Sequence, residues 1–208
     1  MSLLPFLFPA AKLDIDGLYV KVFHLSGWCL REVPRSDAFL VFSDSTGWMG
    51  HGTSKYIKDK SDYRLDDHIR EHAPIPPGKA VAFPVKRIPA RNLIVTNIFD
   101  EQKLTNLDQF QTAFGAALKK NHRLDGWSIT LIDPTDDLNY QEMRMAPERV
   151  ACVIIDSMLR NRKWLTKANI IATNKTSVDA YRAIFDRMRE DQWKYVRYAG
   201  EPDPGLDY

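Results

Sequence analysis

The chain has 208 residues, of which 44% are hydrophobic and 27% are charged, and its formal net charge is +2. This composition is ordinary for a soluble globular protein, and a chain of this length buries a sizeable core as one domain without disulfides or metals. The nearly balanced charge and the lack of a long basic stripe argue against nucleic acid as a partner.

The N-terminal segment, residues 1–17, predicts an extended arm that packs on the domain. It begins apolar, but Pro5 and Pro9 interrupt the run. The run is too short to span a bilayer and lacks the basic start of a signal peptide, so no membrane partner is expected. Cys29 and Cys152 do not have metal-ligand spacing. The simplest expectation is a cytoplasmic chain with two reduced core thiols and no cofactor.

The next segments predict strands and then helix. Leu18–His24 alternates in polarity, as a half-buried strand does. Ala38–Phe42 is nearly all apolar, as a central strand covered on both faces should be. Thr53–Ala73 predicts one helix or two short ones, and the prolines and glycine of Pro74–Gly78 end it.

The middle of the chain predicts two strands, a helix and a third strand. The strands are Lys79–Pro84 and Asn92–Phe99. Thr105 and Asp108 have the spacing of an N-cap and its third helical residue, and apolar residues follow at helical intervals. Ser128–Ile132 predicts a short buried strand, and a polar segment follows it.

The last third of the chain repeats the alternation of helix and strand. Pro147 is well placed to open a helix, Asn169–Thr173 predicts the last strand, and Thr176 or Ser177 is the expected cap of a final helix. The pattern predicts a three-layer α/β/α sandwich with a mixed, mostly parallel six-stranded sheet. One domain over residues 18–190 is expected, with a C-terminal tail at 191–208.

In such sheets, ligands bind in the loops at the carboxyl ends of the strands. Here those loops are Ser43–Gly52, Asp133–Ala146 and the turn around Asn174. The first loop carries Gly47, Gly50 and Gly52 and leads into a helix near Thr53. Glycines let the backbone approach a phosphate closely, and a helix start offers unpaired N–H groups, so this order is typical of anion sites.

Three short motifs occur in the chain in the same order as in a known protein family. Asp37–Asp44 reads Asp-Ala-Phe-Leu-Val-Phe-Ser-Asp and precedes the glycine loop, Pro77–Ala82 reads Pro-Gly-Lys-Ala-Val-Ala, and Ile88–Val95 begins Ile-Pro-Ala. With these motifs the chain resembles the macro domain, the family known for binding ADP-ribose, from about Leu18 to Met188. The resemblance implies the macro-domain fold and a cleft between the first two loops.

The sequence departs from the family where the family handles its ligand. Trp28 stands where an acidic residue usually recognises adenine, and an indole cannot accept the hydrogen bond of the adenine amino group. Val41 and Asp44 align with the asparagines of hydrolytic members. Gly50-His51-Gly52 shortens the glycine run, and an aspartate-rich segment from Asp133 to Tyr140 replaces the second glycine-rich loop. The departures indicate a divergent member whose catalytic apparatus is lost.

The resemblance and the loop positions together nominate the ligand-binding residues Trp28, Asp44, Ser45, Thr46, Gly47, Gly50, His51, Gly52, Thr53, Pro134, Thr135, Asp136, Tyr140 and Asn174. No catalytic residue is assigned, and Asp44 and His51 are the only candidates. Asp44 is either a general base or ribose ligand, or an Asx cap on the turn. His51 either meets a phosphate or acts as an acid, or it is an exposed loop histidine without a role.

Other candidates have two interpretations as well. Trp28 stacks on a base or packs at the sheet edge, and Tyr140 closes over a ligand or anchors its loop. Three aspartates, Asp133, Asp136 and Asp137, either hold a divalent cation or form a solvated acidic loop. His68-Ile-Arg-Glu-His72 has the order of an inverted zinc-peptidase motif, but Pro74 closes the segment and no third ligand is evident, so a solvent-facing helix end is preferred and no metal is expected.

Three functions follow from these interpretations. The first is binding of a nucleotide or ADP-ribose-type ligand without turnover. The second is a structural or protein-interaction domain that has lost the pocket and uses its terminal segments. The third is a hydrolase acting on ADP-ribose derivatives through Asp44 or His51. The cations Arg160, Arg162, Lys163 and Lys167 are attributed to a helix C-terminus, where the helix dipole favours them, rather than to a nucleic-acid patch.

Overall fold

The computed structural model describes residues 8–25, 33–47, 49, 52–61, 64–99, 105–136 and 146–191, without the side chains of residues 52, 53, 136 and 191. The strands are β1 (Ala11–Ile15), β2 (Leu18–His24), β3 (Ser36–Ser43), β4 (Ala80–Pro84), β5 (Ala90–Asn97), β6 (Ser128–Ile132) and β7 (Lys167–Ala172). The helices are α1 (Gly52–Lys60), α2 (Leu65–His72), α3 (Leu107–Arg123), α4 (Pro147–Arg160) and α5 (Lys175–Asp191), and a 3-10 turn, η2, spans Pro134–Asp136.

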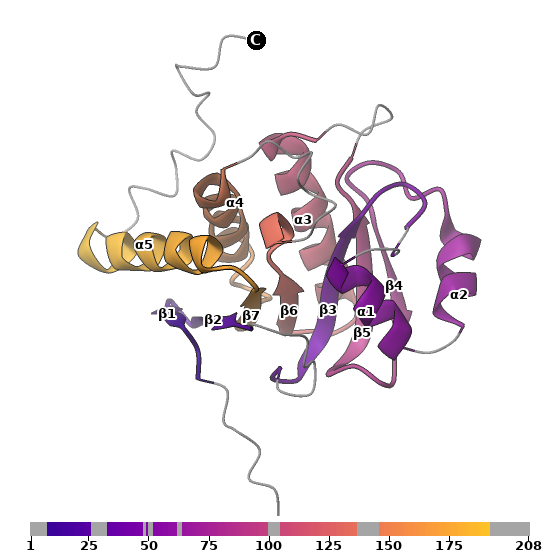
Figure 1. Cartoon of the computed structure of the whole chain (residues 1–208), viewed down its shortest axis with the longest axis horizontal. Helices are drawn as coiled ribbons and strands as arrows, with labels where there is room; N and C mark the ends of the chain where they lie inside the picture. The colour runs from indigo at the N-terminus through magenta and orange to yellow at the C-terminus, as the bar shows by residue number, and fades with distance from the viewer. Residues whose placement is uncertain are drawn as a thin grey trace, which may run out of the picture.

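All seven strands form one mixed sheet in the order β1-β2-β7-β6-β3-β5-β4 (Figure 1). The four inner pairings are parallel, and the edge strands β1 and β4 are antiparallel to their neighbours. The predicted mixed sheet is therefore confirmed, with one strand more than expected. The additional strand is β1, which pairs with β2 from Ala11 opposite Val22 to Ile15 opposite Leu18.

The sheet is covered by helices on both faces, which confirms the three-layer sandwich. Along β3, Phe39 and Val41 join a cluster that contains residues of α1 and α2. Leu40 and Phe42 join the larger cluster with α3, α4 and α5, where the Phe42 ring lies 5.1 Å from that of Phe110. Because side chains alternate between the faces of a strand, a central strand with two covered faces must be apolar throughout.

The segment predicted as one helix or two forms two, α1 and α2, but two predicted caps are wrong. Asn106, not Thr105, caps α3: its Oδ1 accepts from the Gln109 N–H at 2.9 Å, and Gln109 Oε1 accepts from the Asn106 N–H at 3.0 Å. The reciprocal pair satisfies two N–H groups, which a threonine one residue earlier does not do. At α5, the Asn174 side chain accepts from the Ser177 N–H at 2.8 Å, so the cap precedes the residues predicted for it.

Asp37 joins the amino ends of β3 and β6. Its Oδ2 accepts from the N–H groups of Trp127 and Ser128, both at 3.0 Å, and from the Ser128 hydroxyl at 2.7 Å. Partial burial raises the pKa of Asp37, but these hydrogen bonds and the nearby Arg91 guanidinium outweigh it and hold the pKa below its ordinary value. The first residue of the macro-type motif thus has a structural role, at the sheet edge opposite to the candidate site.

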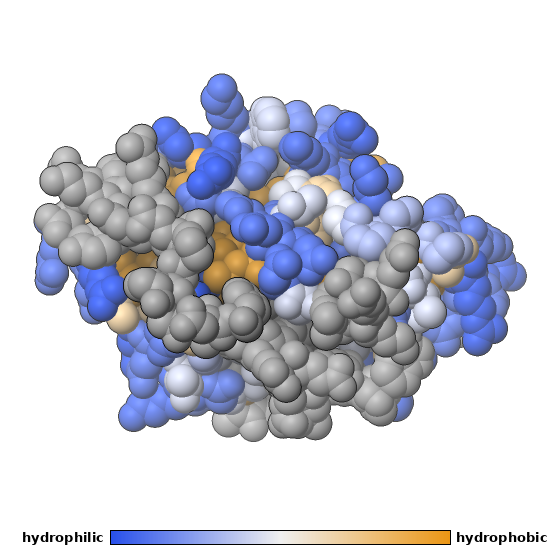
Figure 2. Space-filling view, turned by 90° about the horizontal axis from the view of Figure 1, so that it is seen from above, coloured by the Kyte–Doolittle hydropathy of each residue, from blue (hydrophilic) through white to orange (hydrophobic). Residues whose placement is uncertain are grey.

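The described surface is mainly hydrophilic on the face seen in Figure 2, with a small group of hydrophobic residues in a hollow. The large hydrophobic side chains exposed on the described part of the chain are Phe8, Leu124 and Trp127. Within that same part, no helix combines the length and the hydropathy needed to cross a membrane. Cys152 is a half-buried free thiol against the larger cluster, and its burial raises its pKa. Cys29 lies outside the described residues.

Candidate functional site

Three loops meet at the carboxyl edge of the sheet. Strand β6 pairs in parallel with β3 on one side and with β7 on the other. Their carboxyl ends therefore lie side by side, and so do the segments that begin at Asp44, Asp133 and Thr173 (Figure 1). The structure thus brings the described parts of the three predicted loops to one edge.

The first loop begins with a turn closed by Asp44. Its Oδ1 accepts from the Thr46 N–H at 2.8 Å and from the Thr46 hydroxyl at 2.6 Å, and its carbonyl accepts from the Gly47 N–H at 3.1 Å. This is the geometry of an Asx turn, the structural alternative that the sequence left open. Ser45 and Thr46 are exposed at the tip of the turn.

The first glycine of the loop lies against α2. Gly47 is buried with φ +67°, and a Cβ added there would collide with Cγ2 of Ile69. The Ser45 carbonyl accepts from the Ile75 N–H at 2.6 Å, which fastens the same turn to the segment after α2. Glycine is therefore required here for the close approach of a helix and for the left-handed backbone.

The remainder of the first loop is described only in part. Helix α1 begins at Gly52, one residue before the predicted entry near Thr53. The N–H groups of its first turn have no partner within the helix, as at every helix start. Gly50 and His51, like Trp28 and Tyr140, lie outside the described residues.

The second loop begins with a buried carboxylate. Asp133 is 1% exposed, and its Oδ2 accepts from the Tyr181 hydroxyl at 2.6 Å. Its Oδ1 accepts from the Thr135 N–H at 2.8 Å and from the Thr135 hydroxyl. The expectation of a solvated or cation-binding Asp133 is wrong, because both oxygens are engaged by donors inside the protein. Pro134 is buried beside it, and the side chain of Asp136 is outside the description.

The same network binds the second loop to the third. The Thr135 hydroxyl lies 3.0 Å from the hydroxyl of Ser177, a fully buried residue in the first turn of α5. The Ser177 N–H in turn donates to Asn174, whose side-chain oxygen is thereby used as a helix cap. The sequence predicted Ser177 only as a helix cap, and the role of Tyr181 was missed. The available signal was a tyrosine within an apolar helix stripe, because a buried hydroxyl needs a partner.

The histidines of the inverted zinc-peptidase motif lie at an exposed helix end, which is the interpretation that the sequence favoured. His68 and Glu71 are about half exposed or more, and the His72 ring packs edge-on against Phe83 at 5.3 Å. In the part of the chain that the structure describes, no three His, Cys, Asp or Glu side chains are placed to hold a metal ion.

Comparison with known proteins identifies the fold. No family model and no curated protein matches the sequence. Among solved structures, a mutant of the Oceanobacillus iheyensis macrodomain with ADPR has a TM-score of 0.71 at 11% identity, over 86% of this chain and 98% of that one. The Trypanosoma brucei macrodomain in complex with ADP-ribose has a TM-score of 0.68 at 11% identity, over 86% of this chain and 74% of that one. The chain has the macrodomain fold.

Proposed function

We propose that the chain binds a nucleotide or an ADP-ribose-type ligand at the carboxyl edge of the sheet and does not turn it over. The observation that carries the proposal is the convergence of the loops after β3, β6 and β7 at one edge of a macrodomain fold. Similar macrodomain structures contain ADP or ADP-ribose. The start of α1 after the first loop adds a partial positive charge suited to a phosphate.

The buried network supports this proposal on electrostatic grounds. The aspartates of the second loop would repel a diphosphate if all of them faced it. Asp133 does not face the ligand, because its two carboxylate oxygens accept hydrogen bonds from Tyr181 and Thr135 inside the protein. The exposed Lys175, directly after Asn174, adds a cation beside the third loop. The charge at this edge is therefore less negative than the sequence indicates.

The absence of turnover is proposed from the first loop. A general base must lie within reach of the proton it removes, and a carboxylate that is held in a turn is less free to reach it. Asp44 uses Oδ1 to hold Thr46 in the Asx turn. If a hydrolase activity on ADP-ribose derivatives is measured, Asp44→Ala and His51→Ala decide whether these residues carry it. Unchanged rates in both variants would exclude them.

Isothermal titration calorimetry with ADP-ribose, ADP and AMP tests the binding. A saturable heat at one ligand per chain is expected for at least one of them. Ser45→Trp places a bulky side chain on the exposed turn and is expected to abolish the heat. Thr166→Trp, at an exposed position next to the amino end of β7, makes a matched change at the other edge and should leave it intact.

One observation favours a second function, an interaction domain without a pocket. The Ile69 side chain occupies the space beside Gly47, and the Asp44 carboxylate is hydrogen-bonded to Thr46. These parts of the first loop therefore stabilise the loop itself. Flat calorimetric traces for every nucleotide, from a protein with a normal cooperative unfolding transition, would support this alternative. A strictly monomeric chain that binds neither nucleotide nor partner would count against it.

A further inference from the structure

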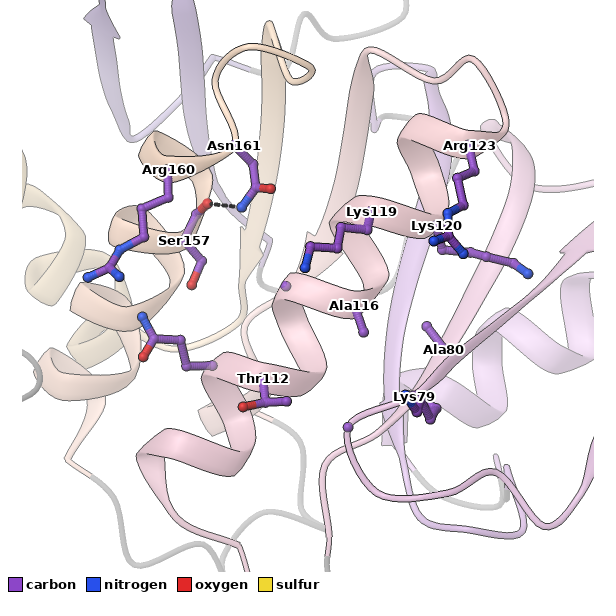
Figure 3. Close-up of a pocket in the computed structure, with 13 residues that line it drawn as sticks. Lys79, Ala80, Thr112, Ala116, Lys119, Lys120, Arg123, Ser157, Arg160 and Asn161 are labelled. Atoms are coloured by element: carbon purple, nitrogen blue, oxygen red, sulfur yellow. Dashed lines mark hydrogen bonds between the residues drawn. The ribbon is translucent and has the colours of Figure 1, made fainter.

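A groove of about 680 Å³ crosses α3 between β4 and α4 (Figure 3). It shares no lining residue with the loops after β3, β6 and β7, and at Lys79 it reaches the carboxyl end of β5, where the Lys79 carbonyl accepts from the Asn97 N–H. Its lining comes from three separate parts of the chain: Gly78–Ala80, α3 and the end of α4. The middle of α3 presents small side chains there, and a Cβ added at Gly115 would meet nothing within 4 Å. An extended ligand can therefore lie close to this helix.

Every charged residue that lines the groove is a cation. They are Lys79, Lys119, Lys120, Arg123 and Arg160. Lys119 reaches from α3 towards α4, whereas Lys120 and Arg123 lie on the side of α3 that faces β4 (Figure 3). Arg160 is paired with Asp156, but within the described residues the other four cations make no ion pair. Cations near the C-terminus of a helix interact favourably with the helix dipole. Lys79 belongs to another segment, so the dipole does not explain why all of these cations gather here.

The wall of the groove holds a polar group without a partner. Ser157 is 3% exposed, and its hydroxyl makes no hydrogen bond in the described part of the chain. A buried hydroxyl is ordinarily paired, so the unpaired Ser157 hydroxyl is an unusual polar group in this wall. Gln111 and Asn161 also line the groove, and each already donates one hydrogen bond, Gln111 to the Asp156 carboxylate at 3.0 Å and Asn161 to the Ser157 carbonyl at 2.7 Å. Hydrogen-bond donors among unpaired cations suit phosphate oxygens.

Three aromatic side chains, His122, Trp164 and Trp127, lie near the groove-lining residues Arg123 and Asn161, where α3 and α4 end, and Trp127 is the exposed one among them. The His122 ring, next to Arg123, stacks on Trp164 with a centroid distance of 4.8 Å, and the backbone N–H of Trp164 donates to the carbonyl of Asn161 at 2.9 Å. Trp127 is 49% exposed and meets His122 edge-on at 6.4 Å. Cations that follow a backbone, with aromatic rings beside them, are the usual parts of a single-strand nucleic-acid site.

We propose that this groove binds single-stranded nucleic acid, with phosphates along the four unpaired cations and a base against Trp127. The initial expectation of no nucleic-acid partner rested on the lack of a basic stripe in the sequence. The fold assembles the cations from positions that are about 40 residues apart, such as Lys79 and Lys119. This site is independent of the proposed function at the carboxyl edge.

Fluorescence anisotropy of a labelled 20-nucleotide oligothymidine with the full chain tests the proposal. Binding should weaken with salt, with a slope of log K against log salt of about −3 for four phosphates. Lys119→Ala/Lys120→Ala should weaken binding by roughly tenfold and reduce the slope by about 1 to 2. Trp127→Ala should weaken binding several-fold with little change in slope.

The matched control is Lys86→Ala/Arg87→Ala, which removes the same charge from the exposed turn at the other end of β4. It should change the affinity by less than about twofold. Equal losses in both double variants, no binding at low salt, or equally tight binding of polyglutamate or tripolyphosphate would each overturn the proposal. Calorimetry with ADP-ribose should give the same result for Lys119→Ala/Lys120→Ala as for the parent chain, which separates the two sites.

Discussion

The Tyr181 hydroxyl donates a hydrogen bond of 2.6 Å to the buried carboxylate of Asp133. The bond joins the start of the second loop to the first half of α5, 48 residues later in the chain. Together with Thr135 and Ser177, it holds two of the three loops at the carboxyl edge in fixed positions. A preorganised edge of this kind binds a ligand at less entropic cost than a mobile one.

Tyr181→Phe tests the energetic weight of this bond. The variant keeps the ring, which packs 6.3 Å from Phe185, and removes only the hydroxyl. Loss of one donor to a buried carboxylate should lower the free energy of unfolding by about 1–3 kcal/mol. Urea denaturation measures it, with Tyr19→Phe as the control, because that hydroxyl makes no hydrogen bond among the described residues. Equal stabilities for the two variants would contradict the role of the network.

Gly47→Ala should destabilise the protein more than Gly17→Ala. Both glycines have positive φ, +67° and +81°, so each alanine carries the cost of a left-handed backbone, about 1–2 kcal/mol. Only the Cβ at position 47 also collides with Ile69, whereas nothing lies within 4 Å at position 17. Overpacking should add about 1–3 kcal/mol, measured by chemical denaturation. Similar losses in both variants would show that α2 does not pack on the loop as described.

Asn106→Ala should lower stability by about 1 kcal/mol, because it removes the side-chain acceptor of the capping box at the start of α3. Thr105→Ala, one residue earlier, should change stability by less than about 0.5 kcal/mol. The two midpoints in one thermal or urea series decide between the neighbouring caps. A larger loss at Thr105 would restore the cap that the sequence predicts.

Asp37 should contribute to stability at neutral pH and lose that contribution in acid. Its folded-state pKa is lowered, so the folded protein binds the proton less readily than the unfolded chain does. The contribution is complete above the unfolded pKa of about 3.9 and disappears as the pH falls through the lower folded value. Asp37→Asn should therefore be less stable at pH 7 and show a flatter acid limb of stability against pH. An unchanged acid limb would contradict this assignment.

The sequence predicted the parts of the fold that depend on local pattern. Ala38–Phe42 was assigned correctly because a strand with two covered faces is apolar throughout. Strand β1 was missed although Ala11, Leu13 and Ile15 alternate with the exposed Lys12 and Asp14, the pattern of a half-buried strand, because the prolines before it favoured an extended arm.

Partnerships across the chain could not be predicted. The burial of Asp133 depends on Tyr181, and the basic groove combines Lys79 with residues of α3 and α4. No spacing in the sequence marks either of these two partnerships. The cap of α3 was predicted wrongly for a local reason. Thr105 and Asn106 are both good cap residues, and the reciprocal hydrogen bonds with Gln109 decide between them.

The most direct test of the central claim is a titration of the isotope-labelled chain with ADP-ribose, followed by amide chemical shifts in two-dimensional NMR spectra. The account predicts saturable shifts that gather in residues 43–53, 133–136 and 173–177, with little change in β1 or in the groove beside α3. A spectrum of the folded protein that does not change at saturating ADP-ribose, or shifts confined to the groove, would contradict it.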